Sequence, residues 1–174
     1  MTIGLRKGTV KLVPYTSEWE KLFEEEKELL LSSIGDYAVD IQHIGSTAIP
    51  GLAAKPIIDI AVAVRDRENV QKCIKPLQDV GYEYKGEREP GNFLFVKGDP
   101  AQRTRYLHMV EWDSKLWEDY LFFRDYLRRH KKAADEYARI KRELAHRFAM
   151  DREEYTKGKA MFIEKVLKRR STCD

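Results

Sequence analysis

Residues 43–64, HIGSTAIPGLAAKPIIDIAVAV, are the most informative part of the sequence for both the fold and the candidate site. It holds a Gly-Ser pair, Gly45 and Ser46, ahead of an apolar run that contains one acidic residue, Asp59. Side chains of a strand alternate between two faces, so Asp59 shares its face with small residues such as Ala61 and has room beside it. An ionised carboxylate among apolar residues needs a cation or hydrogen-bond donors. The run therefore predicts a strand whose aspartate binds a metal ion or pairs with a basic side chain.

The Gly-Ser pair follows a second predicted strand, YAVDIQHI, at residues 37–44. A glycine at the start of a helical turn lets the backbone approach a ligand closely, and the free N–H groups of the turn attract anions. The Ser46 hydroxyl can donate a hydrogen bond to a phosphate oxygen, although serine is also common as a helix N-cap. We therefore expect Gly45 and Ser46 to bind phosphate beside a metal ion held by Asp59.

A Gly-Ser pair followed by a strand with metal-binding carboxylates resembles the nucleotidyltransferase signature of the DNA polymerase beta-like superfamily. The stretch is neither a Walker A loop nor a GxGxxG fingerprint. The superfamily usually places a second carboxylate two residues after the first, and Ala61 occupies that position here. One interpretation is a single Mg²⁺ held by Asp59 together with substrate phosphates and water. The other is a site that binds nucleotides without turning them over.

Longer segments resemble one family. HIGSTAIPGLAAKPIIDI, together with VKLVPYTSEW at residues 10–19, RTRYLHMVEW at 103–112 and LWEDYLFFRDYLRRH at 116–130, is similar to the GrpB family. The resemblance extends from about Val10 to Leu167. It implies an α+β fold with a mixed, nucleotidyltransferase-like sheet, helices packed on that sheet and a C-terminal helical segment.

A partner for Asp59 is expected from the strand within RTRYLHMVEW. Alternation puts Tyr106 and His108 on one face, and Leu107 and Glu111 on the other. The face of Leu107 is apolar, so the Tyr106/His108 face is favoured as the polar one. His108 is therefore the second candidate catalytic residue and a candidate metal ligand, and Glu111 near the strand end is the alternative ligand.

His43 is a further candidate ligand. If His43 and His108 converge on Asp59, the three residues would form a two-histidine, one-carboxylate transition-metal site. A lone strand histidine is more often a hydrogen-bonded structural group, so this site is the weaker alternative.

Several basic residues are candidates for phosphate binding. Lys55, Arg103 and Arg105 lie close in sequence to the two strands, and arginine binds phosphate through a fork whereas lysine acts as a point charge. Lys141 and Lys159, in the later helices, can also turn toward the site. The alternative for each is an ordinary solvated surface charge.

The chain of 174 residues fits a single domain, 1–174, with an α/β core at 1–112 and C-terminal helices at 113–170. The patterns predict a helix, two strands, a helix, three strands and then helices, with a capping box at Ser17 and Glu20 and N-caps at Asp66 and Asp151. Strands that precede a run of helices favour an α+β domain in which the helices cover one side of a mixed sheet.

Composition excludes several classes. No apolar run is long enough to span a membrane and no signal-peptide core is present, so a cytoplasmic protein is expected. Cys73 and Cys173 have no zinc-site spacing and are expected to be free thiols. The net charge is +3, and acidic residues interrupt the basic runs, so nucleic acid is not the expected partner. The oligomeric state is left open.

These features predict a protein that binds a nucleoside triphosphate with Mg²⁺, or another phosphorylated small molecule, and transfers a nucleotidyl group to an unidentified acceptor. The first alternative is a non-catalytic module that binds a ligand or a protein on a degenerate nucleotidyltransferase fold. The second is a histidine/aspartate metalloenzyme.

Overall fold

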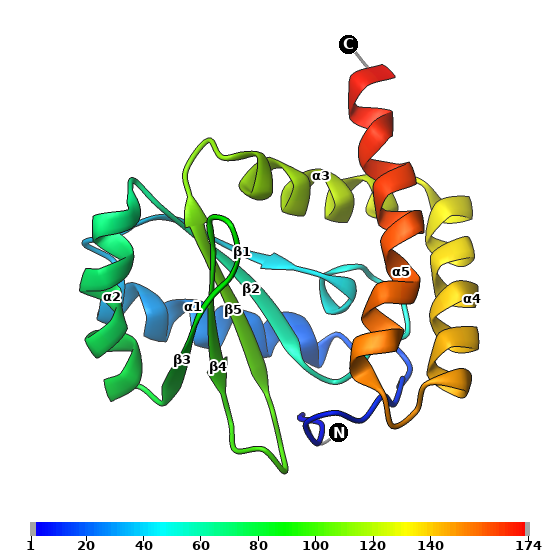
Figure 1. Cartoon of the computed structure of the whole chain (residues 1–174), viewed down its shortest axis with the longest axis horizontal. Helices are drawn as coiled ribbons and strands as arrows, with labels where there is room; N and C mark the ends of the chain where they lie inside the picture. Colours follow the sequence, from blue (N-terminus) through cyan, green and yellow to red (C-terminus); the bar gives the residue numbers. More distant parts are fainter. Residues whose placement is uncertain (1–2, 173–174) are drawn as a thin grey trace.

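The computed structural model describes residues 3–172, in which a five-stranded mixed sheet lies between two groups of helices (Figure 1). The order of its elements is the order that the sequence predicts. The elements are α1 (Glu18–Ile34), β1 (Ala38–Ile44), the 3-10 turn η1 (Ser46–Ala48), β2 (Ile58–Val64), α2 (Arg67–Asp79), β3 (Tyr82–Glu89), β4 (Asn92–Lys97), β5 (Arg105–Glu111), α3 (Lys115–Arg129), α4 (Lys131–Arg147), α5 (Arg152–Leu167) and the 3-10 turn η2 (Lys168–Thr172).

The strands lie in the order β1-β2-β5-β4-β3. The pair β2–β5 is parallel, and the other three pairs are antiparallel. The sheet is therefore mixed, as predicted, and β2 with its apolar run lies between β1 and β5. Six of the seven β2 side chains are buried, and Asp59 alone is partly exposed.

Helices cover both faces of the sheet, so the expectation that they cover one side is wrong. Ile60 and Val62 of β2 pack in one core cluster with Trp19 of α1. On the opposite face, Ala61 packs with Trp117 of α3. The physical reason is that β2 is apolar on both faces, and each face must be removed from water.

The helices α4 and α5 pack beside α3 rather than on the sheet itself (Figure 1). Tyr137 of α4 stacks on Phe162 of α5 with ring centroids 5.0 Å apart, and Leu127 of α3 is buried in the same cluster. Ile49 and Leu52, in the loop that follows η1, complete this cluster. The C-terminal helices therefore pack against the loop that directly follows the Gly-Ser turn.

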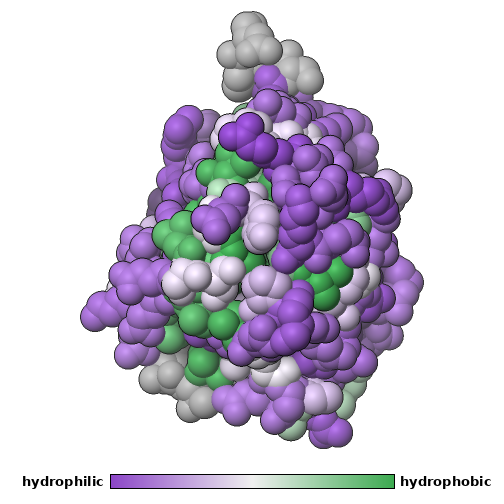
Figure 2. Space-filling model, turned by 90° about the vertical axis from the view of Figure 1, so that its left-hand side faces the viewer, coloured by the Kyte–Doolittle hydropathy of each residue, from purple (hydrophilic) through white to green (hydrophobic). Residues whose placement is uncertain are grey.

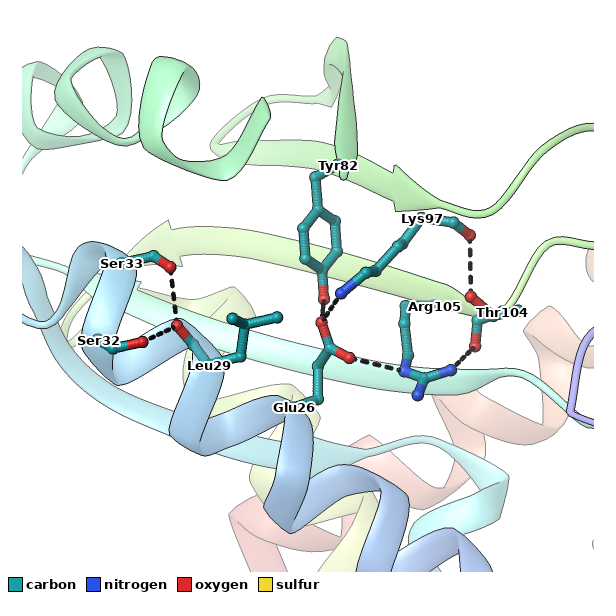
Figure 3. Close-up of polar contacts among 8 residues, drawn as sticks. All are labelled: Glu26, Leu29, Ser32, Ser33, Tyr82, Lys97, Thr104 and Arg105. Carbon is teal, nitrogen blue, oxygen red and sulfur yellow. Dashed lines mark hydrogen bonds and ion pairs between the residues drawn. The ribbon is translucent and has the colours of Figure 1, made fainter. Parts of the chain in front are cut away.

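A buried ion-pair network joins α1 to strands β3, β4 and β5 (Figure 3). Glu26 of α1 accepts hydrogen bonds from the Tyr82 hydroxyl at 2.9 Å and from Lys97 Nζ at 2.7 Å. Arg105 of β5 donates through Nε to the other carboxylate oxygen at 3.2 Å. Only 6% of Glu26 is exposed, so this carboxylate depends on its three partners.

The caps predicted at Asp66 and Asp151 are present, whereas Ser17 makes no side-chain capping hydrogen bond, so the predicted capping box of α1 is wrong. Asp66 accepts a hydrogen bond from the backbone N–H of Asn69 at 2.9 Å, and Asp151 accepts one from the backbone N–H of Glu154 at 3.1 Å.

On the face of the molecule that carries α2, hydrophilic residues dominate the surface, and hydrophobic residues are visible between them (Figure 2).

Cys73 is a buried free thiol, as predicted, whereas Cys173 lies outside the described residues. Within residues 3–172, no helix has the length and hydrophobicity that a membrane span needs.

Candidate active site

The Gly-Ser turn lies directly against Asp59. Ile44, the last residue of β1, pairs with Asp59 of β2, so the chain enters the turn beside the carboxylate. Gly45 has φ 71° and ψ −169°, a conformation that is essentially limited to glycine. A Cβ at this position would lie 2.7 Å from Oδ2 of Asp59. The structure therefore brings together the two features on which the sequence analysis depends, and glycine is required where they meet.

His43 lies apart from this site. It pairs with Ile60 in the sheet, so its side chain is on the face opposite Asp59, where it stacks on Phe23 with ring centroids 4.8 Å apart. Its Nε2 lies 2.9 Å from Oγ1 of Thr47. Burial first, and then the charges of Arg128 and Arg124, lower the pKa of His43 to about 3. The grouping of His43 with Asp59 as a metal ligand is thus corrected, because one step along a strand reverses the face.

Two arginines of α3 donate hydrogen bonds to backbone carbonyls on either side of the Gly-Ser pair. Arg124 donates to the backbone carbonyl of His43 at 3.0 Å, and Arg128 donates through Nε to the carbonyl of Ala48 at 2.8 Å. Gly45 and Ser46 lie between these two anchors. Neither arginine was predicted from the sequence, because their partners are backbone atoms that are distant in sequence.

Tyr106 and His108 share the face of Asp59, as predicted. In the parallel pair β2–β5, Asp59 is opposite Tyr106, and Ala61 is opposite His108. Both β5 side chains are partly exposed, whereas Leu107 and Met109 on the other face are fully buried.

Glu111 does not lie near Asp59. It pairs with Val64 at the opposite end of β2 and is on the other face of the sheet. The grouping of Glu111 with Asp59 as the alternative ligand is therefore corrected.

Polar residues of the β3–β4 hairpin and of α3 surround His108. Its Nδ1 lies 3.3 Å from Oδ1 of Asn92 and 3.4 Å from the Tyr120 hydroxyl. Burial lowers the pKa of His108, while the negative charges of Asp59 and Glu89 oppose that shift. No sequence signal identified Asn92 or Tyr120, since Asn92 is the first residue of a hairpin strand and Tyr120 belongs to a helix.

Three lysines lie within electrostatic range of Asp59. Burial, followed by the charge of Lys159, lowers the pKa of Lys55 to about 7. Burial and the charges of Lys159 and Lys55 likewise lower the pKa of Lys141 to about 7. Burial also lowers the pKa of Lys159, and attraction by Asp59 opposes the shift in all three lysines. The charges are thus mutually repulsive, and one aspartate does not neutralise them.

The lysines of α4 and α5 are held by tyrosines one helical turn earlier. Lys141 lies over the ring of Tyr137 at 5.0 Å, and Lys159 lies over the ring of Tyr155 at 4.7 Å. Lys55 approaches the Tyr155 ring at 5.3 Å. The spacing Tyr-x-x-x-Lys occurs in both helices and is the sequence signal that could have identified these pairs.

Lys141 is almost completely buried, with 1% exposed, and donates to the carbonyl of Ala53 at 2.5 Å.

Arg152, at the start of α5, joins the site to the N-terminal segment. It donates to the Tyr106 hydroxyl at 2.5 Å, to the carbonyl of Arg6 at 3.0 Å and to the carbonyl of Thr9 at 2.9 Å. Its positive charge also lowers the pKa of Lys55 and Lys159. Arg152 was not predicted from the sequence, since no local pattern marks an arginine whose partners, the carbonyls of Arg6 and Thr9, are distant in sequence.

Arg103 and Arg105 are not part of this site. Arg105 binds Glu26 on the opposite face, and Arg103 donates to the carbonyl of Gly98 at 2.5 Å and lies 3.5 Å from Glu83. The strand alternation that exposes His108 to Asp59 turns Arg105 away from it. The grouping of these arginines with the Gly-Ser turn is therefore corrected.

The donor set near Asp59 fits one hard cation. No group of three or more His, Cys, Asp or Glu side chains able to hold a metal ion occurs in the part of the chain that the structure describes. A single carboxylate still suits Mg²⁺, which commonly retains water and completes its shell with substrate phosphates. Asp59 is the residue that would hold such an ion.

Comparisons with known proteins agree with this architecture. Residues 9–169 match the family model described as GrpB protein. The chain is 37% identical over 170 residues to the glutamate-rich protein GrpB of Alkalihalophilus pseudofirmus, with 95% of this chain and 98% of that protein covered. The crystal structure of the conserved protein GrpB from Enterococcus faecalis matches with a TM-score of 0.84 and 35% identity, covering 91% of this chain and 96% of that one.

The fold extends to nucleotidyltransferases. The crystal structure of the Cid1 poly(U) polymerase with Mg 3'-dATP bound matches with a TM-score of 0.53 at 14% identity, covering 77% of this chain and 43% of that one. This similarity confirms the α+β, nucleotidyltransferase-like sheet. With the family match over most of its length, the chain belongs to the GrpB family.

Proposed function

We propose that this protein binds a nucleoside triphosphate with Mg²⁺ on the Asp59 face of its sheet and transfers the nucleotidyl group to an acceptor hydroxyl. The observation that carries the proposal is the contact between Gly45 and Asp59, which puts an anion-binding backbone turn and a cation-binding carboxylate at one point. In a phosphate group with bound Mg²⁺, the phosphate would bind to the turn and the Mg²⁺ would bind to the carboxylate.

The lysines supply the remaining charge. Burial first, and then repulsion by neighbouring lysines, lower the pKa of Lys55 and Lys141 in the free protein. A polyphosphate chain would relieve this repulsion and pair with the ammonium groups. The proposed roles are therefore Mg²⁺ binding for Asp59, phosphate binding for Gly45 and Ser46, and charge neutralisation for the three lysines. A bound Mg²⁺ would polarise the phosphate under attack.

The fold supports this class of ligand. The distant structural neighbour is a poly(U) polymerase whose structure contains Mg 3'-dATP. That ligand belongs to the neighbour, and it supports the proposal for this chain only through the shared fold. A cytoplasmic location, where nucleoside triphosphates are abundant, is part of the proposal.

Calorimetric titration with Mg-ATP, Mg-GTP and Mg-UTP tests binding. We expect wild type to bind at least one of them and Asp59→Asn to weaken that affinity by tenfold or more. Glu111→Gln is the matched control, because Glu111 is an exposed carboxylate on the opposite face of the sheet. The proposal is wrong if wild type binds no nucleoside triphosphate, or if both variants lose affinity equally.

One observation favours binding without transfer. Ala61 occupies the position of a second carboxylate, is fully buried and packs with Trp117 of α3. A two-carboxylate metal site therefore does not form on β2. Incubation with nucleotides labelled at the α-phosphate, in the presence of a metabolite extract, separates the two functions. A labelled product that disappears in Asp59→Asn supports transfer, whereas nucleotide binding without product supports a binding module.

A further inference from the structure

The tip of the β3–β4 hairpin reaches the Asp59 face through Asn92. Glu89 and Asn92 face each other across the hairpin turn. The Asn92 amide Nδ2 lies 2.9 Å from Oε1 of Glu89 and 3.1 Å from the Tyr120 hydroxyl. Asn92 is 4% exposed, so its amide must find its partners within the protein.

The Glu89 carboxylate fixes the orientation of this amide. A carboxylate only accepts hydrogen bonds, so the group of Asn92 that faces it must be the NH₂. The reversed amide would put two oxygens 2.9 Å apart. The carbonyl oxygen of Asn92 therefore faces Nδ1 of His108 at 3.3 Å.

The orientation of the amide in turn selects the tautomer of His108. A carbonyl oxygen accepts and cannot donate, so Nδ1 beside it must carry the ring proton. Nε2 then has a free lone pair. His108 is partly exposed on the face of Asp59, and no hydrogen bond within the described residues engages its Nε2.

We propose that Glu89 and Asn92 are positioning residues, which hold His108 in the Nδ1–H tautomer so that Nε2 accepts the proton of the acceptor hydroxyl. This role rests on the proposed function only in its last step. There the hydroxyl oxygen forms a bond to the α-phosphorus, and the bond from that phosphorus to the departing pyrophosphate breaks with its electron pair. The hydroxyl proton passes to Nε2.

Tyr120 offers the competing arrangement. Its hydroxyl lies 3.4 Å from Nδ1, and a hydrogen bond donated by Tyr120 would require the ring proton to be on Nε2. That arrangement would bring the Asn92 carbonyl against the lone pair of Nδ1, which is unfavourable. Removal of the Asn92 carbonyl should therefore shift the ring to the Nε2–H tautomer.

The ¹⁵N resonances of imidazole distinguish protonated from unprotonated ring nitrogens, and they test the tautomer without any nucleotide. The chain has four histidines, so loss of one set of signals in His108→Asn assigns the residue. In wild type, at a pH where the ring is neutral, we expect a protonated Nδ1 and an unprotonated Nε2. In Asn92→Leu, which has a similar volume and no acceptor, we expect the Nε2–H tautomer.

A double variant restores the hydrogen-bond chain. In Glu89→Gln with Asn92→Asp, a glutamine amide donates to the new carboxylate, whose second oxygen accepts from Nδ1. The Nδ1–H tautomer should return in this protein, although the single Asn92→Leu variant loses it. Arg88→Gln, an exposed change on the same hairpin, should leave the tautomer unchanged.

The outcomes separate this inference from the proposed function. A wild-type ring protonated at Nε2, or a tautomer that does not respond to Asn92→Leu, overturns the inference whether or not nucleotides bind. If the tautomer is as expected and transfer occurs, kcat should fall at least tenfold in Asn92→Leu and recover in the double variant. A kcat that is unchanged in Asn92→Leu would refute the role of Nε2 while leaving nucleotide transfer intact.

Discussion

Gly45 and Asp59 are packed so closely that a methyl group on Gly45 would lie 2.7 Å from Oδ2 of the carboxylate. The backbone of the turn and the oxygens of Asp59 therefore border the same small volume. A ligand that touches one must touch the other, which is why a metal-bound phosphate suits the pair.

Gly45→Ala should destabilise the protein more than an equivalent change nearby. The matched control is Gly51→Ala, because Gly51 also has a positive φ, 80°, but no atom lies within 4 Å of the place that its added methyl group would take. We expect a loss of about 3 kcal/mol for Gly45→Ala and about 1 kcal/mol for Gly51→Ala in urea denaturation. In an Asp59→Ala background the cost of Gly45→Ala should approach that of Gly51→Ala. Equal costs for the two alanines in wild type would contradict the close contact.

The stability of the free protein should rise with pH above neutrality. The folded state lowers the pKa of Lys55 and Lys141 from 10.5 to about 7, so the unfolded chain holds more protons between those values. The free energy of unfolding then increases with pH in that window, by on the order of 1 kcal/mol per pH unit for each of the two lysines. Denaturation at a series of pH values from 7 to about 9.5 measures this slope.

Lys141→Met should reduce that slope, because it removes a lysine that is 1% exposed. Lys75→Met is the control, since the Lys75 side chain is 76% exposed and pairs with Asp79 at the surface. A slope that Lys141→Met leaves unchanged would show that Lys141 titrates normally.

Polyphosphate should bind together with protons. A bound anion stabilises the charged ammonium groups and raises the pKa of Lys55 and Lys141 from about 7 toward the ordinary value. Between pH 7 and about 9 the protein should therefore take up protons on binding tripolyphosphate, and the affinity should fall as pH rises. Titrations in buffers of different ionisation enthalpy count these protons. Binding without proton uptake in wild type would argue that the anion binds away from the lysines.

Glu26→Gln should weaken the fold and spare the candidate site. The change removes the only carboxylate bound by both Lys97 and Arg105 among the described residues, and Arg105 is 9% exposed. Breaking such a pair typically costs about 3–5 kcal/mol, because buried cations lose their partner. The variant should nevertheless bind nucleotides at low temperature with wild-type affinity, since the network lies on the other face. Glu68→Gln, at an exposed pair with Lys72, should change stability very little.

Local sequence signals predicted the fold well. The order of helices and strands follows from periodicity and from caps such as Asp66, which act within a few residues. The meeting of Gly45 with Asp59 was also predictable, because both lie in one short segment that links two adjacent strands. Alternation along β5 correctly placed His108 on the polar face.

The rest of the site depended on partners distant in sequence. Arg105 looked like a phosphate ligand because nothing local shows that Glu26 of α1 binds it on the far face. Asp59 influences the pKa of Lys141 and Lys159 because α4 and α5 pack beside α3, a tertiary arrangement that helical periodicity does not specify. The tautomer of His108 depends on a hairpin tip and could not be read from β5 alone.

The proposed ligand site is assembled from segments that leave the ribosome at very different times. Asp59 and the Gly-Ser turn emerge early, whereas Lys159, Tyr155 and Arg152 belong to α5, and Arg152 also fastens the N-terminal segment through the carbonyls of Arg6 and Thr9. A nascent chain that lacks α5 therefore has the carboxylate, Lys55 and Lys141 but neither Lys159 nor Arg152. The proposed site would therefore be complete only after α5 has docked against the segment that contains Arg6 and Thr9.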